Sequence, residues 1–499
     1  MNFYQTILSR KFLLLLLILF VAIFLYSLWG RTPDIDDAWI GVDAYTLAMD
    51  GYVHTELMRG INHQEELFVV HHKLLNLHGA LFIKTFGFSL YTLKSVSLVY
   101  FLVFICLFYL YAVRWRQLFN GNELLFSMVL IFAFPWIVKY SFLYRPEIMM
   151  MTYGFVGFIL LEKYLEPSGN KPWLLFVSGL FFGLTMATHL NGLILATSAF
   201  FLLVWNKKYL PVLVYGSGVI LAFMIYFYDY TNPSYFDLWR LQFFNAPYLD
   251  SMDSGPVWLK PLFNLMNEHM RYFHNLKIIV YSVFLITTIL VGFKFLYRNH
   301  TNLTRFAILV AVMTGVLAMH KSRQYFLLNI PYLVILITLT FKALKEGKIT
   351  HFMTGKITTI KAILVFFLLV FLSTSTYYNI KSSLQKFSPK QNRELALRYA
   401  DGRESEMNIV APMSFFFDEV ENFKRIQGDL CYIQLQKMDS TIYGEGFLQK
   451  AAGFDAEIIM VEPYYQPMLG IDHFSVGDII AGYKVIDKTD HSLVFKRLH

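Results

Sequence analysis

The chain has 499 residues, of which 56% are hydrophobic, 18% aromatic and only 16% charged. Soluble proteins carry about 25% charged residues, so this composition excludes an ordinary soluble protein and indicates a membrane protein. The net charge of +8 does not require a nucleic acid, because Lys and Arg are retained on the cytoplasmic side of membrane proteins. Cys106 lies in an apolar run and Cys431 in a polar segment, which excludes a disulfide framework.

Eleven apolar runs are predicted to be membrane-spanning segments. They cover residues 12–29, 90–113, 124–141, 147–163, 173–188, 190–205, 209–228, 277–296, 305–319, 325–341 and 362–378. The first run is too long for the apolar part of a signal peptide, so we expect it to be an uncleaved span. Polar residues at 188–192 separate the fifth run from the sixth, and this pair is expected to be broken or re-entrant.

Basic residues in the loops predict the orientation. They lie before the first run, after the second, fourth, sixth and eighth, and between the tenth and eleventh, at Arg10, Lys11, Arg114, Arg116, Lys163, Lys171, Lys207, Lys208, Arg298, Arg305, Lys342, Lys345, Lys348, Lys356 and Lys361. With eleven crossings, all of them fall on one side, which is therefore the cytoplasm. The exterior then receives loops 30–89 and 229–276, two short turns and the chain after residue 378. In a bacterium, this describes a multi-pass protein of the inner membrane with a cytoplasmic N-terminus.

The chain changes character after residue 378. We predict helices at 389–400, 415–427 and 447–453, strands at 408–412, 430–435 and 456–461, and a hairpin of 482–487 with 492–496. This pattern indicates a small α/β domain with no glycine-rich phosphate loop and no metal-ligand cluster. The predicted organisation is a transmembrane domain at 1–378 and a soluble extracytoplasmic domain at 379–499.

Three carboxylates, Asp34, Asp36 and Asp37, stand where the first span emerges into water. Acidic side chains are costly near hydrocarbon and tend to mark function there. A helix is predicted from residue 37, and Asp34 suits the role of its N-cap. Asp36 and Asp43 recur at seven residues and would share a helix face. Paired carboxylates suit a general base, because a nearby like charge raises one pKa; the choice between Asp36 and Asp37 stays open.

Basic groups also lie in the exterior loops. His71, His72 and Lys73 suit a phosphate, with lipid headgroups or a metal as alternatives. Lys321 and Arg323 stand in an exterior turn, against the positive-inside bias, and would clamp a phosphate or snorkel to the interface.

Two further polar segments lie at span ends. Arg145 and Glu147 open the fourth run, where they either serve a site or simply pair with each other. His189 and Asn191 interrupt an apolar stretch and either line a polar cavity or pack inside the protein.

These segments, in this order, resemble GT-C glycosyltransferases, and among them the protein O-mannosyltransferase and aminoarabinose lipid A transferase families. The likeness spans about residues 10–340. It rests on Asp36-Asp37-Ala38-Trp39, Asp50-Gly51-Tyr52-Val53, Phe86-Gly87, Arg145-Pro146-Glu147, the residues of 187–192, and Arg323-Gln324-Tyr325-Phe326-Leu327 with Pro331. The Pro-Pro-Leu segment of these families is missing, and His71-His72-Lys73-Leu74 stands in its place.

The resemblance implies an α-helical polytopic membrane protein of GT-C type, with about 11 transmembrane helices and a small C-terminal α/β domain. It implies a hexosyl- or pentosyl-type enzyme of the cell envelope that moves a sugar from a polyprenyl-phosphate donor to a lipid, glycan or protein acceptor. Transfer would be inverting and need no cofactor, with Asp36 or Asp37 as base. The donor phosphate would be held by Lys73, Arg145, Lys321 and Arg323. The predicted substrate-binding residues are Asp43, His71, His72, Glu147, His189, Asn191 and Tyr325.

Two other functions compete with this reading. A transporter or flippase of lipid-linked saccharides predicts charges near mid-membrane and repeated halves, whereas here the charges lie at one rim and no repeat is found. A binding or assembly protein that acts through its C-terminal part predicts that Asp36→Asn leaves function intact. Related transferases differ in metal use, and no metal site is expected in this chain.

Overall fold

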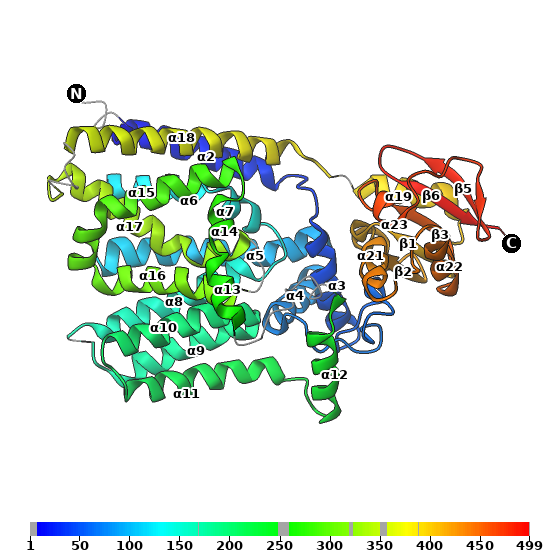
Figure 1. Ribbon diagram of the computed structural model, residues 1–499, viewed down its shortest axis with the longest axis horizontal. Coiled ribbons are helices and arrows are strands. Elements are labelled where there is room, and N and C mark those ends of the chain that lie inside the picture. Colours follow the sequence, from blue (N-terminus) through cyan, green and yellow to red (C-terminus); the bar gives the residue numbers. More distant parts are fainter. Residues whose placement is uncertain are drawn as a thin grey trace. The chain divides into compact units, whose positions relative to one another are not determined.

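The computed structural model describes residues 7–167, 169–247, 259–318, 323–349, 357–387 and 389–498. The described chain is largely helical and carries one six-stranded sheet in its C-terminal part (Figure 1). Contacts divide it into two compact units. The helical unit consists of Met1–Arg31, Ser97–Phe227 and Gly255–Lys386, and the mixed unit of Thr32–Val96, Tyr228–Ser254 and Phe387–His499. The expected domain boundary at 378 and 379 stays a prediction, since each unit gathers three separate segments.

All eleven predicted spans are helical over most of their length. The helices are α2 (Arg10–Leu28), α5 (Leu90–Tyr109), α6 (Gly121–Ala133), α7 (Pro135–Tyr140), α8 (Glu147–Leu165), α9 (Pro172–Thr188), α10 (Leu193–Trp205), α11 (Pro211–Phe223), α15 (Leu276–Asn299), α16 (Thr301–Leu317), α17 (Ile330–Lys345) and α18 (Ile357–Leu384). Among the described helices, five are long and apolar enough to cross a membrane: those at Arg10–Leu28, Leu90–Trp115, Glu147–Leu165, Leu276–Asn299 and Ile357–Leu384. Short helices α13 (Lys260–Met266) and α14 (His269–Phe273) precede α15.

Two breaks interrupt the predicted spans, one within the third span and one between the fifth and the sixth. Pro135 begins α7 directly after α6, because its ring and missing N–H prevent one continuous helix. The expected break between the fifth and sixth spans is also present: α9 ends at Thr188 and His189 is extended. A short 3₁₀ turn, Leu190–Gly192, then leads into α10. The His189 ring accepts the Asn191 N–H at 2.9 Å, so the exposed backbone donor of this break is satisfied.

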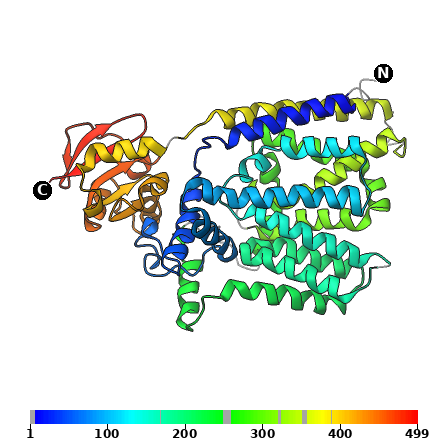
Figure 2. The same ribbon diagram turned by 180° about the vertical axis from the view of Figure 1, so that it is seen from behind.

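Helices α9 and α11 lie side by side, and glycines of α9 face the backbone of α11 (Figures 1 and 2). Gly179 and Gly183 are four residues apart on α9. A Cβ at Gly179 would stand 2.2 Å from the Tyr215 carbonyl oxygen, and one at Gly183 would stand 2.4 Å from that of Val219. Small residues at this spacing let two backbones touch, which is a common way to join helices in a membrane.

The mixed unit begins with the loop that follows α2. It contains α3 (Ile35–Met49), a 3₁₀ turn at Glu56–Met58, α4 (Lys73–Phe86) and α12 (Ser234–Phe244). Buried Gln242 of α12 ties that helix to the loop: its amide donates to the Asn62 and Leu67 carbonyl oxygens, and its Oε1 accepts the Val69 N–H at 2.9 Å. The chain on either side of α12 is thereby held against residues 62–69.

The C-terminal part of the mixed unit is an α/β fold. Its sheet has the order β2-β1-β3-β6-β5-β4, in which β1, β2 and β3 are parallel and the remaining pairs antiparallel. The strands are β1 (Asn408–Ala411), β2 (Arg425–Gly428), β3 (Ala456–Val461), β4 (Ile479–Ile480), β5 (Tyr483–Lys488) and β6 (Leu493–Arg497), and the helices α19 (Pro389–Ala400), α20 (Phe416–Glu419), α21 (Asp429–Met438), α22 (Glu445–Gly453) and α23 (Gln466–Leu469).

Two expectations for this part were wrong. The helix predicted at 415–427 covers only α20, and its last residues form β2. The strand predicted at 430–435 is α21. Leu430, Cys431 and Leu435 are buried at helical spacing, and parallel β2 and β3 require a crossover between them, usually a helix. The predicted helices at 389–400 and 447–453, strands at 408–412 and 456–461, and C-terminal hairpin are present.

Candidate functional site

The N-terminus of α3 gives different roles to its carboxylates. Asp34 occupies the N-cap position. Asp37 is fully buried, and its Oδ2 accepts the Asp34 N–H at 2.8 Å and lies 3.2 Å from Nζ of Lys94. Lys94 is buried as well and donates to the Thr32 carbonyl oxygen at 3.0 Å. Asp37 therefore closes the first turn and neutralises a buried cation.

Asp36 is the partly exposed member of the doublet. A base that meets a substrate has to be reachable from outside, and of the two adjacent carboxylates Asp36 is the one that is not fully buried. Asp43 lies seven residues further along the same helix, which corresponds to about 10.5 Å of axial rise. The two share a face but are too far apart along the helix axis to act as a close carboxylate pair.

A buried chain of polar side chains links α3, α4 and the segment before α12. Asn76 Nδ2 donates to Asp43 Oδ2 at 3.3 Å and lies 3.1 Å from His71 Nδ1. His71 Nε2 lies 3.3 Å from Asp229 Oδ2, and Lys73 Nζ donates to both Asp229 oxygens at 2.8 and 2.6 Å. We call Asp43, Asn76, His71, Asp229 and Lys73 the loop network.

The loop network places a lysine among aromatic rings. Lys73 has no exposed side-chain surface, whereas Asp229 is 25% exposed. The ammonium group lies 5.7 Å from the Tyr228 ring and 5.1 Å from that of Tyr230, distances at which a ring face attracts a cation. Lys73 is also the first residue of α4, whose free N–H groups favour an anion at the same point. The local chemistry therefore favours a negative charge at this point, and the Asp229 carboxylate supplies one.

Burial and charge set the protonation of this network. Burial raises the pKa of Asp43 well above its usual range, against the hydrogen bond from Asn76 and the charge of Lys73. Burial lowers the pKa of His71 to about 3, with a smaller contribution from Lys73. Burial also lowers the pKa of Lys73 to about 8, although Asp229 opposes this. Burial alone would raise the pKa of Asp229, but His71 and Lys73 together lower it.

At neutral pH the network thus contains a neutral His71 and the ion pair of Lys73 with Asp229, beside Asp43, whose pKa burial raises. The geometry agrees for His71: Nδ1 accepts from Asn76, which leaves Nε2 to donate to Asp229. His72 is half-buried at the N-cap position of α4 and takes no part in the contacts that define the network.

The helical unit holds a second polar group. Arg145 Nη2 lies 2.8 Å from Glu147 Oε1, and Nε reaches both carboxylate oxygens at 3.2 and 3.1 Å. The guanidinium also lies 5.6 Å from the Tyr140 ring centre. Glu147 is buried, while the Arg145 side chain is 15% exposed. The simple pairing that the sequence allowed for these two residues is therefore present.

The same group surrounds Tyr325. This buried tyrosine interacts with the Asn191 side chain, and its ring centre lies 6.1 Å from that of His189. The charges of Glu147 and Arg145 also act on its hydroxyl. The fold thus brings together five predicted residues from three separate stretches of sequence; we call them the tyrosine group. Their role in binding stays a prediction.

Arg271 extends the tyrosine group and was not predicted. It is buried on α14, pairs with Glu268 at 2.6 Å, and its charge also acts on Tyr325. Of the two predicted phosphate ligands nearby in sequence, Lys321 lies outside the described residues. Arg323 begins the 3₁₀ helix Arg323–Leu328.

Asp229 and Lys94 were also missed. Each had a signal in the sequence: Asp229 follows the seventh apolar run as Asp36 follows the first, and Lys94 is a lone cation at the start of an apolar helix. Intramembrane and span-end charges of this kind usually have a partner.

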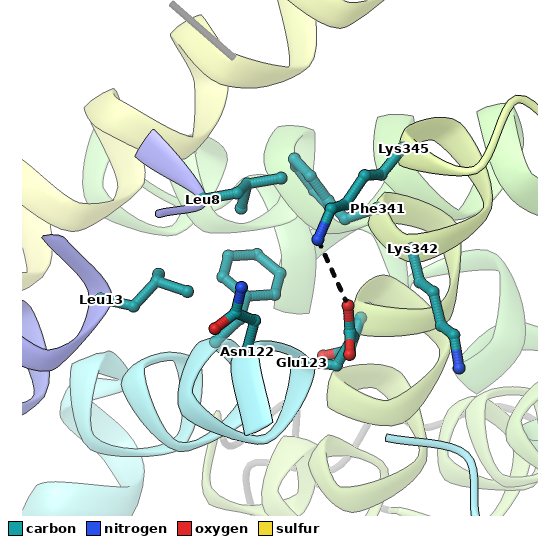
Figure 3. A pocket seen from close by; sticks show the side chains of 9 residues that line it. Leu8, Leu13, Asn122, Glu123, Phe341, Lys342 and Lys345 are labelled. Carbon is teal, nitrogen blue, oxygen red and sulfur yellow. Dashed lines mark ion pairs between the residues drawn. The ribbon is translucent and has the colours of Figure 1, made fainter. Parts of the chain in front are cut away.

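A cavity elsewhere in the helical unit is too small to be a substrate site (Figure 3). It measures about 20 Å³ and is lined by residues before and within α2, on α6 and on α17. Lys345 lies across it from Glu123 at 3.9 Å. This volume admits little more than one water. Among the described residues, no group of three or more His, Cys, Asp or Glu side chains is arranged to hold a metal ion.

No family model matches the chain, and no curated protein matches its sequence. Solved structures do. ArnT from Cupriavidus metallidurans bound to undecaprenyl phosphate superposes with a TM-score of 0.54 and 11% identity, over 98% of each chain. AglB, the oligosaccharyltransferase from Archaeoglobus fulgidus in complex with an inhibitory peptide and a dolichol-phosphate, gives 0.52 and 10%, over 92% of this chain and 70% of its own.

A third similar structure is the arabinofuranosyltransferase AftD from Mycobacteria, with a TM-score of 0.52 and 10% identity over 98% of this chain and 40% of its own. All three are membrane proteins of the GT-C fold, and this chain has that fold. The resemblance predicted from the sequence is therefore confirmed for the architecture, a helical membrane protein with a small C-terminal sheet. Fold alone does not establish an activity, which has to be argued from the site.

Proposed function

We propose that this protein is an integral membrane glycosyltransferase that moves a sugar from a polyprenyl-phosphate donor to an acceptor outside the cytoplasm. The observation that carries the proposal is the loop network. A buried lysine at the start of a helix lies in the same compact unit as a partly exposed carboxylate, Asp36, in a chain of GT-C fold. ArnT with undecaprenyl phosphate and AglB with a dolichol-phosphate support a lipid phosphate as the leaving group.

In the proposed reaction, an acceptor hydroxyl attacks the anomeric carbon of the donor sugar. The new C–O bond forms as the bond to the phosphate oxygen breaks on the opposite face, so the anomeric configuration inverts. Asp36 takes the proton from the attacking hydroxyl. The phosphate leaves with the bonding electron pair as polyprenyl phosphate, and atoms and charge balance without a further reactant.

Lys73 would stabilise the negative charge that develops on the phosphate. A cation in a site without bulk water has a stronger effect than one in solution. Asn76 would hold His71, His71 would hold Asp229, and Asp229 would hold Lys73 in the required geometry. Asp37 is unsuited to act as base, because it is fully buried against Lys94. The tyrosine group is proposed to bind donor or acceptor, as its own function to be tested.

The orientation belongs to the same proposal. The basic residues of the loops favour a cytoplasmic N-terminus and place α3, α4 and the C-terminal sheet outside. In a bacterium the protein would reside in the inner membrane and act on the cell envelope. No metal is needed in the proposed step.

The test is mass spectrometry of envelope glycans and lipids from a deletion strain complemented with wild type, Asp36→Asn or Asp50→Asn. Asp50 ends the same helix, is partly exposed and pairs with His54, so it is the matched control. We expect one sugar to disappear on deletion, to return with wild type and with Asp50→Asn, and to stay at least a hundredfold reduced with Asp36→Asn at equal membrane levels.

Other outcomes exclude parts of the proposal. A sugar restored to the wild-type level by Asp36→Asn would remove Asp36 as the base. An unchanged envelope on deletion, with lipid-linked saccharide accumulating on one side of the membrane, would favour a transporter or flippase.

A further inference from the structure

A second pocket lies in the C-terminal sheet domain. It has a volume of about 610 Å³, within the range of about 300–1,000 Å³ typical of ligand sites. Its walls come from segments far apart in sequence: the stretch before α3, helix α19, the loops after β1 and β3, and the turn between β5 and β6. All of these belong to the mixed unit.

The position of this pocket in the sheet is the one where open α/β folds bind ligands. Strand β1 lies between β2 and β3. The chain therefore adds β2 on one side of β1 and then crosses over to add β3 on the other side. The crevice at the carboxyl ends of strands, where the strand order reverses, is the usual ligand site of such sheets. Ser414 follows β1, and Glu462 and Tyr464 follow β3; all three line the pocket.

The domain differs from a nucleotide-binding fold at one point. The N-terminus of α21, where a phosphate would bind, is filled by Asp429. Its carboxylate is fully buried and accepts the Leu430 N–H at 2.8 Å and the Glu462 N–H at 3.2 Å. One of the N–H groups at this helix end, that of Leu430, is therefore already bonded from within the protein, and the Asp429 side chain lies where an anion would bind. A phosphorylated ligand is therefore disfavoured here.

The lining instead fits hydroxyl groups. The side chains of Glu394 and Glu462 are acceptors, Arg398 is a donor, and Ser414 is both. Ser492 lines the pocket, is 98% buried, and its Oγ lacks a hydrogen-bond partner within the described residues. An unsatisfied buried hydroxyl calls for a partner that the protein does not supply.

An aromatic face completes the lining. Tyr464 is 68% exposed beside these polar groups, and its ring meets that of Tyr465 at 5.2 Å between centres in a T-shaped contact. A flat apolar face next to several hydrogen-bonding groups matches a sugar ring, which has apolar C–H patches and hydroxyls around its edge. Burial raises the pKa of the Glu462 carboxyl group at this wall.

We propose that this pocket binds the acceptor of the transfer reaction, and that the acceptor is a neutral or amino saccharide. The role of the bound saccharide as acceptor rests on the proposed function, whereas the binding of a saccharide to this pocket does not. Pro33 lines the pocket and lies three residues before Asp36, so their Cα atoms are separated by at most about 11 Å. A short oligosaccharide seated in the pocket can extend to the proposed base.

The test uses full-length protein in lipid nanodiscs on an array of neutral, amino and anionic oligosaccharides. Wild type is expected to bind neutral or amino glycans, and the double variant Glu462→Gln with Tyr464→Ala to bind them at least tenfold more weakly. The matched control is Glu445→Gln with Tyr443→Ala, an exposed pair of the same residue types and spacing in the same domain. Asp36→Asn should bind like wild type.

Each failure has its own signature. Absence of binding to the whole array, selection of anionic glycans alone, or equal binding by the Glu462–Tyr464 double variant overturns the saccharide pocket. If that variant also restores the missing sugar in the deletion strain, the transferase proposal survives without the pocket. If glycans bind as expected but deletion changes no envelope sugar, the pocket stands and the transferase proposal fails.

Discussion

The loop network and the tyrosine group neutralise their cations in different ways. Arg145 pairs with Glu147, two residues further along the chain, and keeps 15% of its side chain in contact with solvent. Lys73 is completely buried and pairs with Asp229, 156 residues away. The first pair forms within one turn of a helix start, whereas the second exists only when the first loop and the segment before α12 are folded together. We therefore expect the second to be more sensitive to substitution.

The largest expected effect is that of Asp229→Ala. It leaves Lys73 buried without a carboxylate and takes a partner from His71, and breaking a buried ion pair costs about 3–5 kcal/mol. Thermal unfolding of the purified protein in detergent should show a clear drop in melting temperature. Asp237→Ala, an exposed aspartate on α12, is the control and should change little.

A double variant at Lys73 and Asp229 distinguishes the effect of an unpaired charge from the effect of lost packing. Lys73→Met combined with Asp229→Leu removes both charges and should regain most of the lost stability, while sugar transfer stays absent. If Asp229→Ala melts at the wild-type temperature, the buried Lys73–Asp229 pair is not more sensitive to substitution than the Arg145–Glu147 pair, and the comparison fails.

A smaller effect is expected for Glu147→Gln. Hydrogen bonds to charged groups contribute about 1.5–3 kcal/mol, and Gln keeps one acceptor for Arg145, so the loss should be near the lower value. Arg145 also retains the Tyr140 ring and some solvent. The same unfolding measurement decides the order, and a loss larger than that of Asp229→Ala would reverse the comparison.

A further effect is a pH dependence of the loop network. The folded pKa of Lys73 is about 8, below its unfolded value of about 10.4, so the unfolded state binds more protons between these values. The contribution of Lys73 to stability therefore rises as pH increases from about 8 to 10, and the difference in stability between wild type and Lys73→Met should change in that direction.

Binding should change in the opposite direction. As Lys73 loses its proton above about pH 8, the affinity for polyprenyl phosphate should fall in wild type and stay flat in Lys73→Met. Titration with undecaprenyl phosphate at pH 7 and pH 9 measures this. If wild type binds undecaprenyl phosphate with equal affinity at pH 7 and pH 9, Lys73 does not bind the phosphate.

Features that depend on neighbouring residues were predictable from the sequence, whereas contacts between distant segments were not. Apolar periodicity predicted the spans, and local residue order predicted α19, β3 and the pairing of Arg145 with Glu147. The partner of Lys73 was not predictable, since no local pattern links it to Asp229. The segment at 430–435 was mistaken for a strand because its helix is imposed by the parallel sheet around it and not by its own residues.

The buried carboxylate of Asp429 has a consequence for how the sheet domain evolves and can be engineered. Asp429 supplies an internal hydrogen-bond acceptor at the helix end where a bound phosphate would otherwise accept, and burial raises the pKa of its carboxyl group well above the usual range. The domain can fold with that position occupied at any phosphate concentration, and its recognition surface is free to diverge toward uncharged ligands. The Leu430 N–H at this helix end thus has its acceptor within the domain itself.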